Sequence, residues 1–174
     1  IYKERMDKPG MIQIAGCVNS GRSHLAYALG DDCSHKIIAV SRELKAKRIY
    51  EEYKFLDDNV YIYPPKDILF YHADLRGNAM LKQRMEVVQA LLEQEQLTVI
   101  VSFDGFMDAV LPLTEVKNRI IRLSAGAVVD FEKLKRDIVL LGYEREEQIE
   151  RPGQFAVRGG ILDIYPLTEE VPFR

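Results

Sequence analysis

Eight residues near the start of the chain have the spacing of a phosphate-binding loop with one position changed. Gly16, Gly21 and Ser23 stand where the pattern G-x-x-x-x-G-K-[S/T] requires them, and Arg22 replaces the lysine. Glycines let backbone amides point inward, and the following helix terminus adds positive potential, so such a segment suits an anion. Arginine is a longer planar fork, and it does not reproduce the compact charge that lysine brings to the outer phosphates.

Phosphoryl transfer also needs an acidic residue that holds magnesium and a residue that positions water. The candidate acids are Asp104, after the apolar run 99–103, and Asp130, after residues 127–129. Asp130 is better explained as a helix cap, and Asp104 as an ordinary loop acid beside Gly105. We therefore predict an inherited scaffold turn with at most weak anion affinity, and ATP turnover by this chain is the less favoured alternative.

A second set of candidate residues lies in segment 154–166, with the sequence QFAVRGGILDIYP. Two apolar runs flank the glycine pair 159–160, which predicts a β-hairpin with a glycine turn. A hairpin alone does not explain the arginine at this turn, Arg158. Surface arginines often pair locally, so an ion pair from Arg158 to Asp163 or Glu150 is the alternative to a contact with a partner.

The remaining reactive side chains do not suggest a site. Cys17 and Cys33 lack zinc-finger spacing and are interpreted as reduced thiols, which favours a cytoplasmic protein without a metal. The three histidines are scattered along the chain. One basic cluster is predicted to be a solvated helix face, with DNA contact as the lesser alternative; it consists of Arg42, Lys45, Lys47 and Arg48.

Short apolar runs alternate with amphipathic stretches through the first two-thirds of the chain. This pattern predicts strands at 11–15, 36–40, 60–63 and 97–101, and helices at 23–29, 42–55 and 79–94. Ser41 is the expected N-cap of the second helix, and a polar loop with aromatic residues is expected at 70–72. The alternation implies an α/β fold with a parallel sheet that helices cover on both faces.

The rhythm changes after residues 111–112, and we place a domain boundary near residue 113, giving domains 1–113 and 114–174. The second domain is predicted to be a small β-rich α+β unit. Its expected elements are a β-like run at 118–123, a helix at 131–141 with Asp130 as N-cap and Gly142 as left-handed cap, and strands at 143–149, 155–157 and 161–164.

Composition limits the classes of protein to consider. The chain has 174 residues, 47% of them hydrophobic, which is enough for a packed core. The formal net charge of −3 argues against a dedicated nucleic-acid coat. No apolar run has the length of a membrane span, so no membrane partner is expected. The sequence starts at Ile1 and ends at Arg174 without a closing element, and we expect a piece of a longer chain.

These segments together resemble the amino-terminal UvrB-homology module, domains 1A and 2, of the bacterial transcription-repair coupling factors. The most specific pieces are 154–166, which matches the pattern R-G-x-x-[apolar]-D-[apolar]-[aromatic]-P, and the helix end LGYER at 141–145. Segments 65–84 and 119–123 resemble the same family, so the resemblance covers almost the whole chain. The lysine-less loop favours the coupling factors over UvrB. So does the segment 61–74, which stands where UvrB has an aromatic-rich insertion that clamps DNA.

The resemblance implies a RecA-like partial domain with a degenerate phosphate loop, followed by a domain 2 that binds UvrA. Such a module recruits UvrA to stalled RNA polymerase for transcription-coupled nucleotide excision repair. Arg158 and Arg174 fall on family arginines that contact UvrA.

By the same resemblance, this fragment has no catalytic residues and no cofactor. ATP and magnesium are expected only in motor domains of the parent protein, an ATP-dependent DNA translocase, which also supplies contacts to RNA polymerase and double-stranded DNA. The alternative is a nucleotide-binding ATPase domain of a UvrB-like or helicase-like DNA repair enzyme.

Overall fold

The chain divides into two compact units in a computed structural model that describes residues 10–18, 20–66 and 74–174. The first unit comprises Ile1–Asp67 and Gln89–Asp108, and the second comprises Ile68–Val88 and Ala109–Arg174. The division falls within α4 (Asp74–Glu93), which begins earlier than the helix predicted at 79–94. The aromatic loop predicted at 70–72 and Asn19 of the phosphate-loop segment lie outside the described residues.

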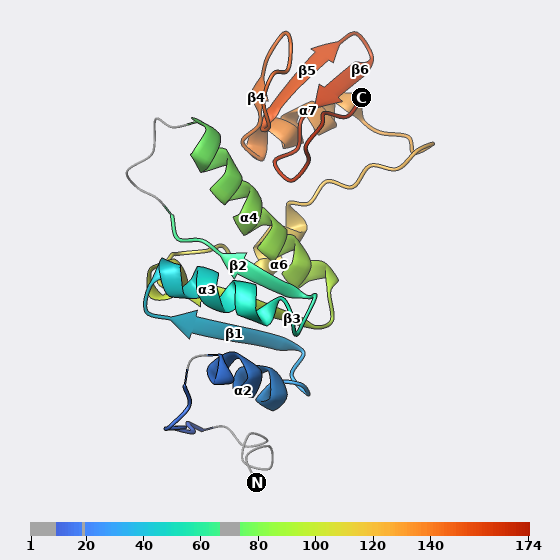
Figure 1. The fold of residues 1–174 in the computed structure, drawn as a ribbon. Coiled ribbons are helices and arrows are strands. Elements are labelled where there is room, and N and C mark those ends of the chain that lie inside the picture. The colour runs from blue at the N-terminus through green and yellow to red at the C-terminus, as the bar shows by residue number, and fades with distance from the viewer. Residues whose placement is uncertain (1–9, 19, 67–73) are drawn as a thin grey trace. The chain divides into compact units, whose positions relative to one another are not determined.

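The first unit is built on a three-stranded parallel sheet. Its strands β1 (His35–Val40), β2 (Val60–Tyr63) and β3 (Leu97–Ser102) lie in the order β1-β3-β2 (Figure 1). The central strand β3 is buried along its whole length, as a strand covered on both faces must be. Edge strand β1 alternates exposed and half-buried residues, and Ile37 on it is 64% exposed. The predicted coverage of both faces is therefore confirmed for β3 and is wrong for β1.

Helix α3 (Glu43–Tyr53) supplies the core that lies against this sheet. Its Ala46 and Tyr53 are buried in one cluster with Val60 and Ile100 of the strands. Part of α2 (Gly21–Leu29) packs on the same cluster. A short helix, α5 (Phe103–Phe106), follows β3 directly. The α/β class predicted from the alternating apolar runs is thus confirmed.

Two local predictions for this unit are wrong. Residues 11–15 form no strand, and Met11 is 95% exposed, because an apolar run gains strand structure only when it pairs with a neighbour. Ser41 is not the N-cap of α3. Arg42 takes that position with extended backbone, and its side chain makes no capping bond.

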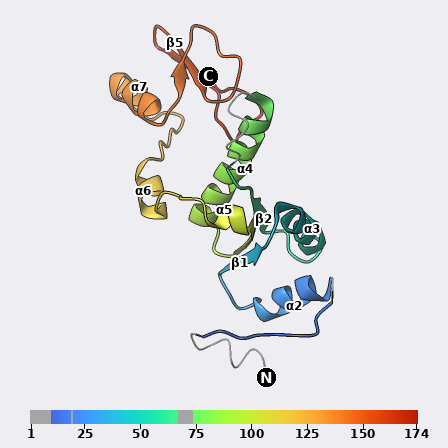
Figure 2. The same cartoon turned by 90° about the vertical axis from the view of Figure 1, so that its left-hand side faces the viewer.

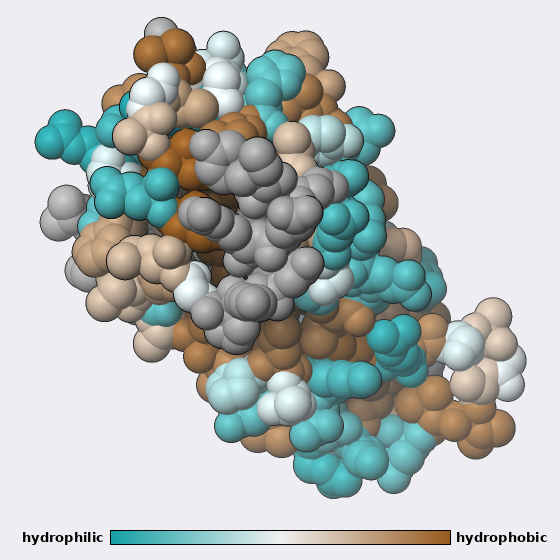
Figure 3. Space-filling model, turned by 90° about the horizontal axis from the view of Figure 1, so that it is seen from below, coloured by the Kyte–Doolittle hydropathy of each residue, from teal (hydrophilic) through white to brown (hydrophobic). Residues whose placement is uncertain are grey.

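The first unit also presents large apolar side chains to its surface, among them Leu44, 82% exposed, and Phe55, 90% exposed. Figure 3 shows one face of the molecule, on which brown apolar areas lie among teal polar ones. The small described sheet therefore does not bury all of the apolar side chains that this unit contains.

The second unit is a mixed three-stranded sheet with one helix packed on it (Figures 1 and 2). Besides the first part of α4, its elements are α6 (Leu113–Asn118), α7 (Phe131–Leu140), β4 (Glu144–Arg145), β5 (Gln154–Arg158) and β6 (Ile161–Ile164). Strand β4 runs parallel to β5, and β5 runs antiparallel to β6. This arrangement confirms the small second sheet that was expected after the parallel one.

The ends of α7 follow the sequence signals closely. Asp130 accepts a hydrogen bond from the backbone N–H of Lys133 at 3.0 Å, as an N-cap does. Gly142 has a φ of 93°, the left-handed conformation that closes a helix end. The β-like run predicted at 118–123 is wrong, because α6 ends at Asn118 and no strand follows. The strand predicted at 143–149 is reduced to the two residues of β4.

A test of the first unit's core concerns the hydroxyl of Tyr53. This residue is fully buried, and its hydroxyl has no hydrogen-bond partner among the described residues. An unpaired buried hydroxyl is unfavourable, so Tyr53→Phe should raise the free energy of unfolding by about 1 kcal/mol. Tyr53→Ala should lower it by about 3–5 kcal/mol, since the ring is lost. Urea denaturation measures both changes, and a clearly less stable Tyr53→Phe variant would contradict the assignment.

Candidate partner-binding site

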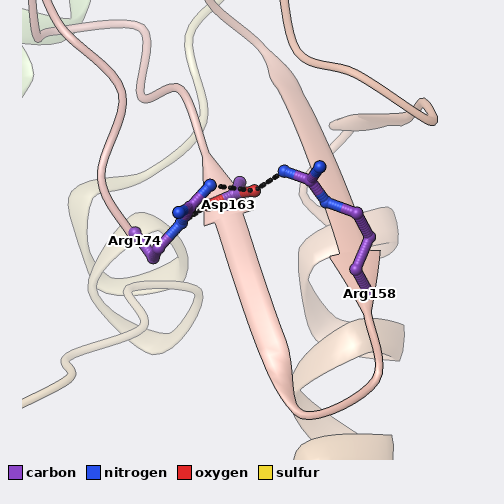
Figure 4. A network of polar contacts seen from close by, with 3 residues as sticks. All are labelled: Arg158, Asp163 and Arg174. Atoms are coloured by element: carbon purple, nitrogen blue, oxygen red, sulfur yellow. Dashed lines mark hydrogen bonds and ion pairs between the residues drawn. The ribbon is translucent and has the colours of Figure 1, made fainter.

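Asp163 lies between two arginines in the second unit. Arg158 donates from Nη2 to Oδ2 of Asp163 at 2.6 Å (Figure 4). Arg174 donates from Nε to Oδ1 at 2.7 Å and from Nη2 to Oδ2 at 3.3 Å. Hydrogen bonds between two ionised groups are short and strong, so one carboxylate orients both guanidinium groups.

The hairpin register brings Arg158 and Asp163 together. Asp163 pairs with Ala156, and Arg158 lies two residues further along β5, so the two side chains are diagonal neighbours on one face. Gly159 makes the tight turn possible, because it has a φ of 61°. Arg174 arrives by a different route. Phe173 exchanges two backbone hydrogen bonds with Ile164, at 2.8 and 2.9 Å, and so fixes the next residue beside Asp163.

The pleat of the sheet separates these polar residues from the core. Leu134 and Ile138 of α7 form one cluster with Phe155, and Val157 packs against it. Successive side chains of a strand point to opposite faces. The face that carries Arg158 and Asp163 is therefore the one turned away from α7.

Exposure differs sharply among the three side chains. Asp163 is 7% exposed, whereas Arg158 is 60% and Arg174 is 68% exposed. A guanidinium group has five N–H donors. Arg158 and Arg174 use only some of their N–H donors in the hydrogen bonds to Asp163. The arrangement presents two oriented, positively charged groups on a nearly hidden carboxylate, which suits a partner that offers carboxylates or carbonyl oxygens.

The electrostatics agree with this geometry. Arg174 and, next, Arg158 lower the pKa of Asp163 from 3.8 to about 2. The same carboxylate raises the pKa of Arg174.

The structure contains the local ion pair that was considered for Arg158, with Asp163 and not with Glu150. Glu150 instead donates its backbone N–H to Oε1 of Gln154. Sequence reasoning missed the shared role of Asp163. The short spacing across a glycine turn is a signal for its contact with Arg158, but no local pattern predicts the contact with Arg174.

The phosphate-loop residues are engaged within the chain. Arg22 donates from Nε to the carbonyl of Cys17 at 3.1 Å, and the buried Ser23 donates from Oγ to Oε2 of Glu52 at 2.8 Å. Arg48 bonds the other oxygen of Glu52 at 3.1 Å. The Ser23 hydroxyl, and then Arg48, lower the pKa of Glu52.

The loop thus keeps part of the expected geometry and lacks the rest. Gly16 has a φ of 83°, and Gly21 begins α2, as a phosphate loop requires. Residues 11–15, which precede the loop, form no strand, and the hydroxyl of Ser23 is hydrogen-bonded to the carboxylate of Glu52. A carboxylate near the start of α2 opposes the binding of phosphate, because like charges repel.

Neither candidate magnesium acid is joined to the loop by a described contact. Asp130 caps α7, as predicted, and Asp104 lies in α5. Within residues 10–18, 20–66 and 74–174, no group of three or more His, Cys, Asp or Glu side chains could hold a metal ion. None of the helices in those ranges is long and apolar enough to cross a membrane.

The residues of this sheet and of α7 fall within the match to one family of interaction domain. The family model of the UvrB interaction domain matches residues 121–174.

Curated relatives extend the match over most of the chain. It is 28% identical to the transcription-repair-coupling factor of Bacillus subtilis over 164 residues, which are 92% of this chain and 14% of that protein. It is 32% identical over 115 residues to the factor of Staphylococcus epidermidis, and 29% identical over 118 residues to that of Staphylococcus aureus. These alignments cover 66% and 67% of this chain, and 10% of each relative.

The chain is homologous to the N-terminal region of transcription-repair-coupling factors over most of its length, and the resemblance inferred from the sequence is confirmed. It spans about a seventh of the length of the Bacillus relative.

The stability of the second unit should depend on pH through Asp163. The folded pKa of about 2 lies below the ordinary 3.8, so the ion pairs stabilise the fold fully above pH 4. That contribution should be lost as the pH falls from about 4 to about 2. Denaturant unfolding at a series of pH values should show that the free energy of unfolding falls more steeply with decreasing pH in the native chain than in Asp163→Asn. An NMR titration that places the pKa of Asp163 near 3.8 would contradict the paired geometry.

Proposed function

We propose that this chain is the UvrA-recruiting module of a transcription-repair-coupling factor and has no catalytic activity of its own. In this proposal it brings UvrA to RNA polymerase stalled at DNA damage, so that nucleotide excision repair begins there. Contacts with RNA polymerase and double-stranded DNA, and ATP hydrolysis with magnesium, belong to other parts of the parent protein, which acts in the cytoplasm.

One observation carries this proposal. Within the region that matches the UvrB interaction domain, Arg158 and Arg174 are exposed but held in place by Asp163. Arginines anchor many protein interfaces, and holding them in advance reduces the entropy that binding would otherwise cost. We assign the contact with UvrA to these two residues.

Residues 1–113 are proposed to form a RecA-like partial domain, homologous to domain 1A, whose degenerate phosphate loop now has a structural role. An ATPase would need the side chains of Arg22 and Ser23 for the nucleotide. In this chain Arg22 contacts the loop's own backbone, and Ser23 contacts Glu52. These contacts favour the recruiting module over the alternative of a UvrB-like or helicase-like ATPase domain.

The role of Arg158 is tested by its affinity for UvrA. Arg158→Ala, in this chain and in the parent protein, should weaken UvrA binding by about 2 kcal/mol, or roughly thirtyfold in Kd, as truncation of an interface anchor does. Isothermal titration calorimetry with purified UvrA measures the change. Asp163 remains paired with Arg174 in this variant, so the fold should be retained.

Arg145→Ala is the matched control for that measurement. Arg145 is an exposed arginine of the same sheet, and its register partner Phe155 belongs to the cluster with α7. Its loss should leave the affinity for UvrA unchanged. If Arg158→Ala bound UvrA as tightly as the native chain, the assigned contact would be wrong.

The structural role of the phosphate loop predicts the behaviour of Ser23→Ala. This variant loses the hydrogen bond to Glu52 and should be about 1–3 kcal/mol less stable in urea denaturation, because a charged acceptor loses its partner. ATP titrations followed by a fluorescent analogue should show no saturable binding at micromolar concentration in either protein. Micromolar affinity in the native chain that disappears in Ser23→Ala would overturn the proposed role.

A further inference from the structure

A groove of about 440 Å³ lies in the second unit, on the side of the sheet that carries α7. One wall is a face of α7 that includes Arg136, Val139 and Leu140, and the other contains Arg145 of β4 and Phe155 of β5. This face of the helix differs from the one that builds the core, which presents Leu134 and Ile138. Helix α7 therefore has a second apolar surface that the fold itself leaves uncovered.

The groove has an accessible apolar lining. Val139 is 53% exposed and Leu140 is 79% exposed, whereas Phe155 is almost completely buried at 1%. Exposed aliphatic side chains beside a concave surface are typical of a place where a partner inserts an apolar residue. Because the space is open on one side, a segment of a protein can lie along it.

The charges around the groove are unequal. Lys135 pairs with Glu132 at 2.6 Å, so these two charges compensate each other. The side chains of Arg136 and Arg145 make no hydrogen bond or ion pair within the described part of the chain, and both residues are exposed. Two uncompensated guanidinium groups thus flank an apolar lining in a chain whose net charge is −3.

We propose that this groove is a docking site for an acidic segment of a protein partner. In this proposal an apolar side chain of that segment packs on Val139 and Leu140, and its Asp or Glu carboxylates bind Arg136 and Arg145. Guanidinium groups bind carboxylates through two parallel hydrogen bonds, which makes an acidic peptide the complementary occupant. A nucleic acid is less suited, because two cations neutralise few phosphates and the lining between them is aliphatic.

The proposed groove is separate from the arginines assigned to UvrA. Arg145 and its register partner Phe155 lie on the α7 side of the sheet, and Arg158 and Asp163 lie on the other side. The two surfaces can therefore be occupied together. This separation makes the docking proposal independent of the proposed UvrA contact.

The test begins with a peptide-display selection against the full chain. The library is first depleted on the double variant Arg136→Glu/Arg145→Glu, so that only peptides requiring the groove remain. We expect the selected peptides to be rich in Asp and Glu around one Phe, Leu or Ile. A selection that yields basic or neutral peptides, or that fails to enrich any peptide on the native chain over the double variant, overturns the proposal.

The affinity of a selected peptide is then measured by fluorescence anisotropy at two salt concentrations. The double variant and Leu140→Asp should each bind at least about tenfold more weakly, and the native affinity should fall with added salt. Lys133→Glu is the matched control, since it makes the same charge change on α7 at an exposed residue outside the groove. The proposed occupant would be wrong if Lys133→Glu weakened peptide binding as much as the double variant does. It would also be wrong if a single-stranded DNA oligonucleotide displaced the peptide.

Two further measurements separate this proposal from the UvrA proposal. Circular dichroism should show that the variants remain folded, because the changed side chains are exposed. The affinity for UvrA should be unchanged in the double variant, whereas peptide affinity should be unchanged in Arg158→Ala. Loss of peptide binding in Arg158→Ala would show that the two surfaces are not independent and would overturn the separate docking site.

Discussion

The antiparallel register of β5 and β6 is the constraint on which the second unit depends. It sends Phe155 and Val157 into the cluster with α7, and it sends Arg158 and Asp163 to the other face. Because side chains alternate along a strand, a shift of one residue would place the charged pair in the core and the aromatic ring outside. Burial of the apolar face therefore fixes the polar face as well, without any separate requirement on the charged residues.

In that register, the negative charge of Asp163 lies between the positive charges of Arg158 and Arg174. Two guanidinium groups close together repel each other, and a nearly buried carboxylate alone would be costly. Hydrogen bonds of 2.6 and 2.7 Å join the carboxylate to the two guanidinium groups. The negative charge reduces the repulsion between the arginines, and the arginines offset the cost of burying the carboxylate. The same bonds restrict long arginine side chains that would otherwise sample many rotamers. The result is a surface that is charged and whose arginine side chains are ordered within the fold itself.

Local signals predicted most of the described elements, and long-range contacts explain the failures. The cap at Asp130, the left-handed Gly142 and the glycine-turn hairpin all depend on residues a few positions apart, so their patterns could be recognised. Residues 11–15 have the composition of a strand but no strand beside them, which sequence alone does not reveal. The bond between Ser23 and Glu52 joins residues 29 positions apart and changes the interpretation of the loop. In the candidate site, Arg158 and its ion pair could be anticipated, whereas the convergence of Arg174 on Asp163 required the fold.

The shortness of β4 has a consequence for how the second unit associates with other chains. With two residues, this strand offers very few unpaired backbone groups along its edge of the sheet. Edges of that kind resist the addition of a foreign strand, which is a common route to aggregation. At this edge, contacts with another chain depend mainly on side chains, where each contact carries its own charge and shape. The edge at β4 therefore offers little backbone template for pairing with a second copy of the domain.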